Sequence, residues 1–321
     1  MSTTKPLFNN ILVATDFSPH AEAALRQAIW LARKASAKIT LAHSFPDLRR
    51  LMYTASLQAR MDLLYGEGNQ FQQEIRQKSN DKMRWKIVDL KATDLAVKCE
   101  TLLGEPYVQL THAVQAEAYD LVMAGSRGLA KWETFFVGST AKRLIRKCPA
   151  SVWIVKAEQV HPPKVILIPT DFSDVSLKAV THGLWLSQIT GAEVHLLHVT
   201  DPLDFPEDYL FPFPDMESLR KELEESAKVR LQTLLASLPA KSNCIQEHII
   251  QGTAWQEIKR LTKQLSADLI VMGTVGRSGI KGLLLGNTAE KVLDTCDCSI
   301  LTVKPDDFVS PILPAVWPLH P

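Results

Sequence analysis

The sequence predicts an α/β protein with two tandem, doubly wound domains, each built on a five-stranded parallel sheet. Three observations support this fold class. The chain has 321 residues, of which 46% are apolar and 22% charged, as is typical of one large or two ordinary globular domains. The two halves carry the same short motifs in the same order. In both halves short apolar runs alternate with segments of helical periodicity, as in sheets covered by helices on both faces.

The internal repeat predicts the domain organisation. ILVATDFS at residues 11–18 returns as ILIPTDFS at residues 166–173, and His43 returns as His198 at the same separation. Cys148 and several glycines return at a slightly shorter separation, so the second copy has lost a few residues after His198. We therefore expect a first domain at residues 1–156, a linker at 157–163, a second domain at 164–305 and a loosely attached, proline-rich tail at 306–321.

Five apolar runs in each half predict strands. The runs are short, rich in Val, Ile and Leu, and mostly without alternation, as expected of strands buried on both faces of a parallel sheet. In the first half they lie at residues 11–15, 38–44, 95–104, 120–126 and 151–156. In the second half they lie at residues 164–170, 193–199, 245–252, 268–274 and 299–304.

The segments between the strands predict amphipathic helices. Ser18 followed by Pro19 is typical of a helix N-cap and a first helical residue. One face of this first helix carries Ala24, Ala28, Leu31 and Ala32. A longer helix in the second half carries an apolar face made of Leu219, Leu223, Ala227, Leu231, Leu234, Leu235 and Leu238.

Charge and hydropathy exclude several classes of partner. Lys and Arg number 36 against 35 Asp and Glu, and this net charge of +1 gives no drive toward nucleic acid or an acidic membrane. No apolar run reaches the roughly 20 residues that a bilayer helix needs. The first ten residues hold no apolar secretion signal, so we expect a cytoplasmic protein.

The five cysteines fit a reducing compartment. Cys148, Cys296 and Cys298 stand just before apolar strands, where we expect buried, reduced thiols. A redox or metal-binding role for Cys296 and Cys298 is the alternative.

A glycine pattern follows the fourth strand of each half. Three glycines are separated by two and then nine residues, and a polar pair opens the next helix. The pattern is neither a Walker loop nor a dinucleotide fingerprint. A strand that ends in glycine lets the backbone approach a phosphate, and a helix N-terminus offers unpaired amides. We expect phosphate binding here, although strand-to-helix turns also use glycine. The residues are Gly125, Gly128, Gly138, Ser139 and Thr140, and Gly273, Gly276, Gly286, Asn287 and Thr288.

These motifs together resemble the universal stress protein family, in its tandem two-domain type and its ATP-binding branch. The resemblance covers residues 9–156 and 164–304. It implies a Rossmann-like, adenine nucleotide alpha hydrolase-like fold with strand order 3-2-1-4-5. It also implies ATP as the cofactor, with or without Mg²⁺, bound between strands one and four, where ligands generally settle in open α/β sheets.

The resemblance assigns roles at the base end of each site. Asp16 and Asp171 resemble the aspartate beside the adenosine, and a turn or helix-capping role is the alternative. Val199 matches the residue that contacts adenine, for which the first half has Ser44. Met123 and Met272 resemble the floor under the base or ribose, and a core role is the alternative.

The second half is the better candidate for nucleotide binding. It combines Pro169 with Asp171 and Val199 at the base end, although Asn287 departs from the usual Ser or Thr. The first half carries Trp132 and Glu133 in its glycine loop, and a carboxylate near a triphosphate is unfavourable unless it points away or binds a metal.

No catalytic residue and no metal ligand is assigned. His43 and His198 end the second strands, where a hydrogen-bonded structural role is expected and proton transfer is the alternative. The sequence contains no nucleophile elbow, no HExxH and no run of metal-ligand spacing. We therefore expect a regulatory protein rather than an enzyme.

The predicted function is that of a stress-responsive, nucleotide-binding regulatory protein, most simply one that binds ATP. Two alternatives stay open. One is a slow ATP hydrolase or phosphotransferase. The other is a sensor of a different ligand, whose apolar part would contact Phe205, Tyr209, Leu210, Phe211 and Phe213.

Protein partners are unknown from the sequence. Members of the family dimerise through strand five, so we expect residues 151–156 and 299–304 to pair within one chain as a pseudo-dimer. A homodimer is the alternative.

Overall fold

The computed structural model describes residues 6–45, 70–128, 137–159, 161–201, 216–237, 245–276 and 285–314. The chain forms two compact units. Unit 1 comprises Met1–Trp132, Gly138–Val160 and Val309–Pro321, and unit 2 comprises Glu133–Val137 and His161–Phe308. No helix in the described part of the chain is long and apolar enough to cross a membrane.

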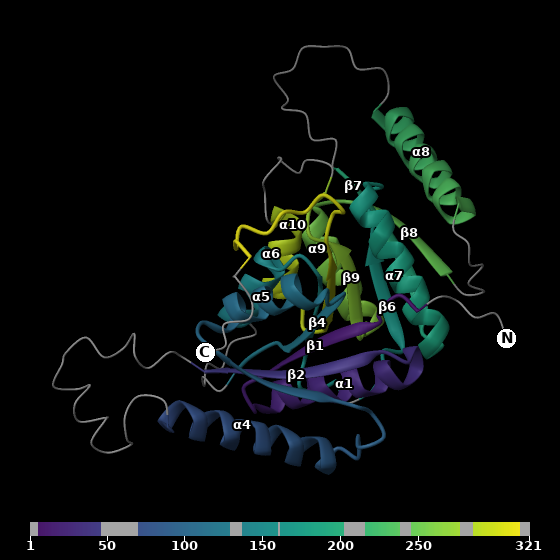
Figure 1. The fold of residues 1–321 in the computed structure, drawn as a ribbon. Coiled ribbons are helices and arrows are strands. Elements are labelled where there is room, and N and C mark those ends of the chain that lie inside the picture. Colours follow the sequence, from purple (N-terminus) through teal and green to yellow (C-terminus); the bar gives the residue numbers. More distant parts are fainter. Residues whose placement is uncertain are drawn as a thin grey trace. The chain divides into compact units, whose positions relative to one another are not determined.

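Unit 1 is a doubly wound α/β domain (Figure 1). Its sheet has the strand order β3-β2-β1-β4-β5, and all of these strands are parallel. This order confirms the one that the family resemblance implies. The elements are β1 (Asn10–Thr15), α1 (Pro19–Ala35), β2 (Lys38–Phe45), α4 (Gln70–Asp89), β3 (Lys98–Leu103), α5 (Pro106–Glu117), β4 (Leu121–Gly125), α6 (Ser139–Lys147) and β5 (Ser151–Val155).

Unit 2 repeats this architecture with the order β8-β7-β6-β9-β10, again all parallel. In each unit the strand order reverses beside the first strand, so a crevice opens there at the carboxyl edge. The elements are β6 (Val165–Pro169), α7 (Asp174–Thr190), β7 (Glu193–Thr200), α8 (Met216–Ser237), β8 (Ile245–Gln251), α9 (Ala254–Leu265), β9 (Leu269–Gly273), α10 (Asn287–Thr295) and β10 (Ser299–Val303).

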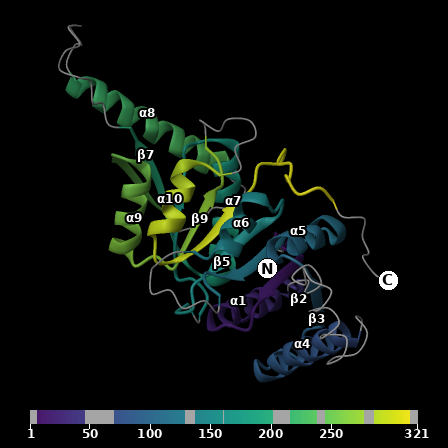
Figure 2. The same cartoon turned by 90° about the vertical axis from the view of Figure 1, so that its left-hand side faces the viewer.

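The helices cover both faces of each sheet. In unit 1, α5 packs beside α6, whereas α1 is joined to α4 by the Lys86–Glu22 ion pair, with the Nζ and Oε2 atoms 2.7 Å apart. Helix α4 lies along β3, as Figure 2 also shows. In unit 2, α9 packs beside α10. Each unit thus has the three-layer arrangement that its alternating sequence predicts.

Burial differs between the two end strands of each sheet. Strands β5 and β10 are buried along their whole length, as the sequence predicts. In contrast, most residues of β3 and β8, at the opposite end of each strand order, are partly or fully exposed. The prediction of burial on both faces is therefore wrong for the third strand of each unit.

Helix α1 begins as predicted. Ser18 is its N-cap and Pro19 its first residue, and the Ser18 hydroxyl accepts a hydrogen bond of 3.2 Å from the Ala21 amide. The predicted apolar face is completely buried. Helix α8 follows its prediction only in its C-terminal half, where Ala227, Leu231 and Leu234 are buried; Leu223 is 39% exposed. Leu238 lies outside the described residues.

The tail is not loose where the structure describes it. Ser310 donates a hydrogen bond to the Lys147 carbonyl at 2.7 Å, and Gln115 of α5 donates one to the Ile312 carbonyl at 2.9 Å. His112 Nε2 lies 3.2 Å from the Leu313 carbonyl. A proline-rich segment cannot pair its own backbone groups, so side chains of α5 satisfy its carbonyls instead. The expectation of loose attachment is therefore wrong for residues 310–313.

Candidate functional site

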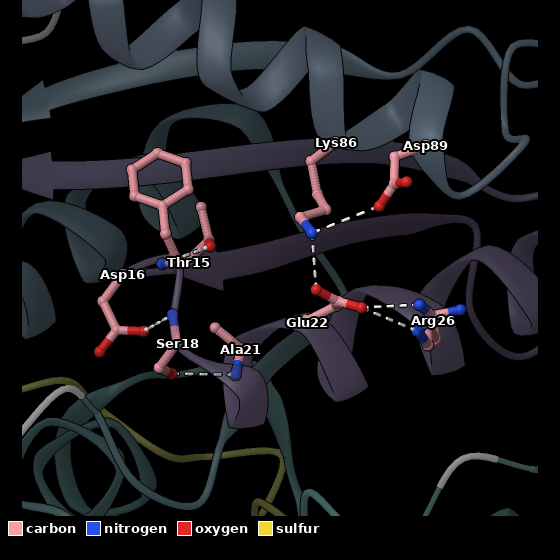
Figure 3. A network of polar contacts seen from close by, with 9 residues as sticks. Thr15, Asp16, Ser18, Ala21, Glu22, Arg26, Lys86 and Asp89 are labelled. Carbon is pink, nitrogen blue, oxygen red and sulfur yellow. Dashed lines mark hydrogen bonds and ion pairs between the residues drawn. The ribbon is translucent and has the colours of Figure 1, made fainter.

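A tight turn after the first strand contains the repeated Thr-Asp-Phe-Ser motif of each unit. In unit 1, Phe17 has a positive φ of 65°, which is uncommon for a residue with a bulky side chain. Two side chains hold the turn: the Thr15 hydroxyl accepts from the Phe17 amide and Asp16 Oδ1 accepts from the Ser18 amide, both at 3.0 Å (Figure 3). These bonds fix the Asp16 carboxylate at the carboxyl edge of the sheet.

The turn of unit 2 has the same construction. Phe172 has a φ of 63°, and its amide donates to the Thr170 hydroxyl at 3.1 Å. Asp171 Oδ1 accepts from the Ser173 amide at 3.0 Å and from the Ser173 hydroxyl at 2.6 Å. Each aspartate thus has the turn role that the sequence left as an alternative, and its carboxylate also lines a cavity.

The aspartate explains the second glycine of each pattern. A Cβ atom on Gly128 would lie only 2.5 Å from Asp16 Oδ2, and one on Gly276 would meet Asp171 Oδ2 as closely. The first glycine has a packing reason too, because a Cβ on Gly125 would lie 2.5 Å from the His20 carbonyl carbon of α1. In unit 1, Gly125 is therefore required by the backbone of α1, and Gly128 by the observed position of the Asp16 carboxylate.

The third glycine has no such reason. Gly138 and Gly286 have ordinary φ values of −63° and −77°. A Cβ on either residue would have its nearest neighbour at 3.5 Å, which is an ordinary van der Waals distance. Both glycines are N-caps, of α6 and α10, and neither helix has a side-chain cap. The uncapped helix N-termini offer amides to the space beside them.

Each unit has a cavity at this edge of its sheet. The cavity of unit 2 has a volume of 520 Å³ and contains every site residue predicted for the second half. They are Pro169, Asp171, Val199, Met272, Gly273, Gly276, Gly286, Asn287 and Thr288. The cavity of unit 1 measures 270 Å³. Its predicted lining residues are Asp16, Gly125, Gly128, Gly138, Ser139 and Thr140.

Met123 does not reach the cavity. Its side chain is completely buried, and Ala124 lines the cavity instead. In the repeat, Met123 corresponds to Val271, which faces Gly183 of α7, whereas Met272 corresponds to Ala124. Pairing the two methionines shifts the strand by one residue, and such a shift moves a side chain to the opposite face of the sheet.

Sequence reasoning missed the helix that follows the third strand. Ala254 and Ile258 of α9 line the larger cavity, and Pro106 and Leu110 of α5 line the smaller one. The periodicity of these residues indicated only a buried helix face. Their equivalence in the repeat, together with their place at the carboxyl edge, is the signal that could have found them.

His43 and His198 have the structural role that was expected. His43 Nδ1 lies 2.7 Å from the Thr15 carbonyl oxygen, and His198 Nδ1 lies 2.8 Å from that of Thr170. The rings pack against Phe17 and Phe172, with centroids 4.6 and 4.4 Å apart. Neither histidine is among the residues that line the two cavities.

The two linings differ in charge. Among the described residues of the larger cavity, Asp171 is the ionisable one. The smaller cavity has Asp16 and also Arg127, at the position of Val275 in unit 2. Beside it, His20 Nδ1 lies 3.0 Å from the Ser126 hydroxyl. Burial lowers the pKa of His20, and Arg127 and Lys156 lower it further. The His20 ring is therefore neutral at pH 7.

The cysteines of the described chain form no disulfide. Cys148, Cys296 and Cys298 are buried, as expected, and Cys99 is half-buried. Burial raises the pKa of Cys296 to about 11, so this thiol carries a proton at neutral pH and is a weak nucleophile. In the same described ranges, no group of three or more His, Cys, Asp or Glu side chains is placed to hold a metal ion.

Several residues singled out in the sequence lie outside the described chain. They are Trp132 and Glu133 of the first glycine loop, and Phe205, Tyr209, Leu210, Phe211 and Phe213 of the segment before α8.

Comparison with known proteins agrees with the repeat. The model of the universal stress protein family matches residues 7–156 and, a second time, residues 163–304. Universal stress protein E of Salmonella typhi is 27% identical over 95% of this chain and 97% of its own length. A universal stress protein of Methanocaldococcus jannaschii is 34% identical over 44% of this chain and 82% of its own length.

A solved structure of a functionally unknown protein from Pseudomonas aeruginosa shares the fold. Its TM-score is 0.65 at 21% identity, over 95% of this chain and 96% of the other. Because the family model matches both units, the chain belongs to the universal stress protein family, with two tandem copies of the family's domain.

Proposed function

We propose that this stress-related protein binds an adenine nucleotide, ATP in the first place, in the cavity of unit 2, and that the bound state is passed to protein partners. The observation that carries the proposal is Gly286. Neither its φ nor its packing requires glycine, yet it stands at the cavity, at the uncapped N-terminus of α10. A glycine that the fold does not need is explained by a ligand that approaches the backbone closely.

The phosphate end of the ligand would lie at α10. The amide of Gly286 itself is used in a bond of 2.7 Å to the Thr274 carbonyl. The amides of Asn287 and Thr288 follow in the first turn, where helical N–H groups have no partner within the helix. Together with the helix dipole they favour a negative charge. Among the described lining residues there is no basic side chain, so Mg²⁺ bound to the phosphates would help to neutralise them.

The base end would lie against the apolar wall of the cavity. Leu197 and Val199 of β7, Ile258 of α9 and Met272 of β9 line it. A volume of 520 Å³ lies within the range of about 300 to 1,000 Å³ that is common for small-molecule sites. An apolar wall facing a row of amides suits a ligand with a flat base at one end and phosphates at the other.

A regulatory role fits the lining better than catalysis does. The ionisable side chain among the described lining residues of unit 2 is Asp171, which accepts two hydrogen bonds within its own turn. A general base must reach the proton of the attacking group, and Asp171 is held by the turn instead.

Replacing Gly286 by Val tests the proposal. The valine side chain would occupy the space beside the α10 amides, so calorimetric titration with Mg²⁺–ATP should show binding at unit 2 weakened by at least about tenfold. Gly138→Val, the same change at the equivalent position of unit 1, is the matched control and should leave that binding intact. Unchanged binding in Gly286→Val would refute the proposal. A thermal unfolding curve like that of the wild type shows that the variant is folded, and Gly286→Ala provides a milder step.

A further inference from the structure

The two cavities have the same position in the repeat but different chemistry. The cavity of unit 1 has about half the volume of the other, 270 against 520 Å³. The smaller value lies below the common range for sites that enclose a drug-sized organic ligand. It is large enough for one or two phosphate groups.

The wall that would hold a base is reduced in unit 1. Leu197 and Val199 of unit 2 are replaced by Ala42 and Ser44, and Met272 is replaced by Ala124. The Ser44 hydroxyl donates a hydrogen bond of 2.8 Å to the Gly104 carbonyl and places a polar group where unit 2 has an isopropyl group. Less apolar surface means less favourable burial for an aromatic base.

Among the described lining residues, the phosphate end of unit 1 has a basic side chain that unit 2 lacks. Arg127 stands between Gly125 and Gly128, where unit 2 has Val275. The Ser18 hydroxyl lies 3.4 Å from the Arg127 carbonyl oxygen and joins this backbone to the cap of α1. The uncapped N-terminus of α6, with Ser139 and Thr140, lies on the same cavity. Arg127 and the first residues of α6 therefore line one small space.

Arg127 has an unused donor. Its Nε atom is buried and has no hydrogen-bond partner among the described residues. A buried donor without a partner costs free energy, and a guanidinium group binds phosphate through two parallel hydrogen bonds. Asp16 is the carboxylate among the described lining residues, and its Oδ1 accepts a hydrogen bond from the Ser18 amide. An oxyanion beside Arg127 would supply the missing acceptor.

We propose that the cavity of unit 1 is a compact oxyanion site that binds inorganic phosphate or pyrophosphate rather than a nucleotide, and that Arg127 binds the negative charge of this ligand. The inference deepens the proposed function, on which it rests for the phosphate-binding character of the glycine pattern. The tandem protein would thus respond to two ligands of different class, a nucleotide in unit 2 and a small phosphate compound in unit 1.

The test is a calorimetric titration of the full chain with sodium pyrophosphate, with sodium phosphate and with ATP. The Gly286→Val substitution weakens binding at unit 2, so titration of this variant measures binding at unit 1. In this background we expect one pyrophosphate per chain. Arg127→Val, which installs the residue of unit 2, should weaken that binding by about tenfold or more, and Arg127→Lys by less, because a lysine keeps the charge but not the two parallel bonds.

Two results would overturn the inference. One is that replacing Arg127 changes the affinity for neither pyrophosphate nor phosphate, or that neither ligand binds at all. The other is that ATP binds to the Gly286→Val chain more tightly than pyrophosphate does and displaces it, since unit 1 would then bind a whole nucleotide. Failure of the proposed function looks different: the wild type would not bind ATP, while binding of pyrophosphate that depends on Arg127 would persist. Thermal unfolding of each variant confirms that it is folded.

Discussion

At the scale of single residues, each of the three glycines in a pattern is glycine for a different physical reason. Gly125 lets β4 end against the backbone of α1, and Gly128 makes room for the Asp16 carboxylate. Gly138 meets neither condition, which is why it points to a ligand. The sequence shows three glycines at a fixed spacing, but it does not separate those that serve the fold from the one that serves the cavity.

This difference can be measured with alanine. Gly128→Ala would force the Asp16 side chain to turn away and to lose its bond to the Ser18 amide, at a cost of about 1 kcal/mol in the free energy of unfolding. Gly138→Ala, with its nearest neighbour at 3.5 Å, is the matched control: it replaces the glycine N-cap of α6 but leaves the bond between Asp16 and the Ser18 amide in place. Amide hydrogen exchange checks the prediction, since the Ser18 amide should exchange faster in Gly128→Ala only, and equally fast exchange in both variants would contradict it.

At the scale of elements, the turn and the first helix form one construction. The Ser18 hydroxyl accepts from the Ala21 amide, and Glu22 in the next turn of α1 binds both Arg26 and Lys86 (Figure 3). The hydrogen bonds from Lys86 and Arg26 lower the pKa of Glu22, so this carboxylate stays ionised at neutral pH. Helix α1 thus carries the cap beside the cavity and the contact to α4.

Removing the cap tests how much the element depends on it. Ser18→Ala leaves the Ala21 amide without its partner, and we expect unit 1 to lose about 1 kcal/mol of stability. Amide hydrogen exchange should speed up first in the opening turn of α1. Ser173→Ala is the matched change in unit 2, where Ser173 caps α7, so there the faster exchange should appear in α7. Faster exchange in the same helix for both variants would contradict the assignment of the caps.

At the scale of the whole molecule, the two units share one fold but differ in the residues that line their cavities. Both sheets have the same strand order, and in both turns the aspartate accepts a hydrogen bond from the amide of the following serine. The cavities nevertheless differ in volume, in their apolar wall and in Arg127. Duplication followed by divergence at the lining is consistent with two ligand-binding units of different specificity.

Buried histidines predict how stability changes with pH. Burial lowers the pKa of His182 in α7 from 6.5 to about 4. The unfolded chain therefore binds more protons between these values, so stability is complete above pH 6.5 and falls as the pH drops toward 4. At pH 5 the loss from this one group is about 2 kcal/mol.

Urea unfolding between pH 7.5 and 5 measures this effect. His182→Leu should make the stability of unit 2 depend less on pH in this range. Some dependence will remain in the variant, because burial also lowers the pKa of His195 and His248. An unchanged slope in His182→Leu would show that this histidine binds protons equally in the folded and the unfolded chain.

The sequence by itself determined the tandem repeat, the ten strands to within a few residues, the cap of α1 and the glycine spacing, because these depend on local pattern and on comparison of the two halves. The tertiary structure alone decided which residues meet at each cavity. Ala124 rather than Met123 faces the smaller one because neighbouring residues of a strand point to opposite faces. The lining from α5 and α9 and the docking of residues 310–313 are contacts between segments distant in sequence, which no local pattern records.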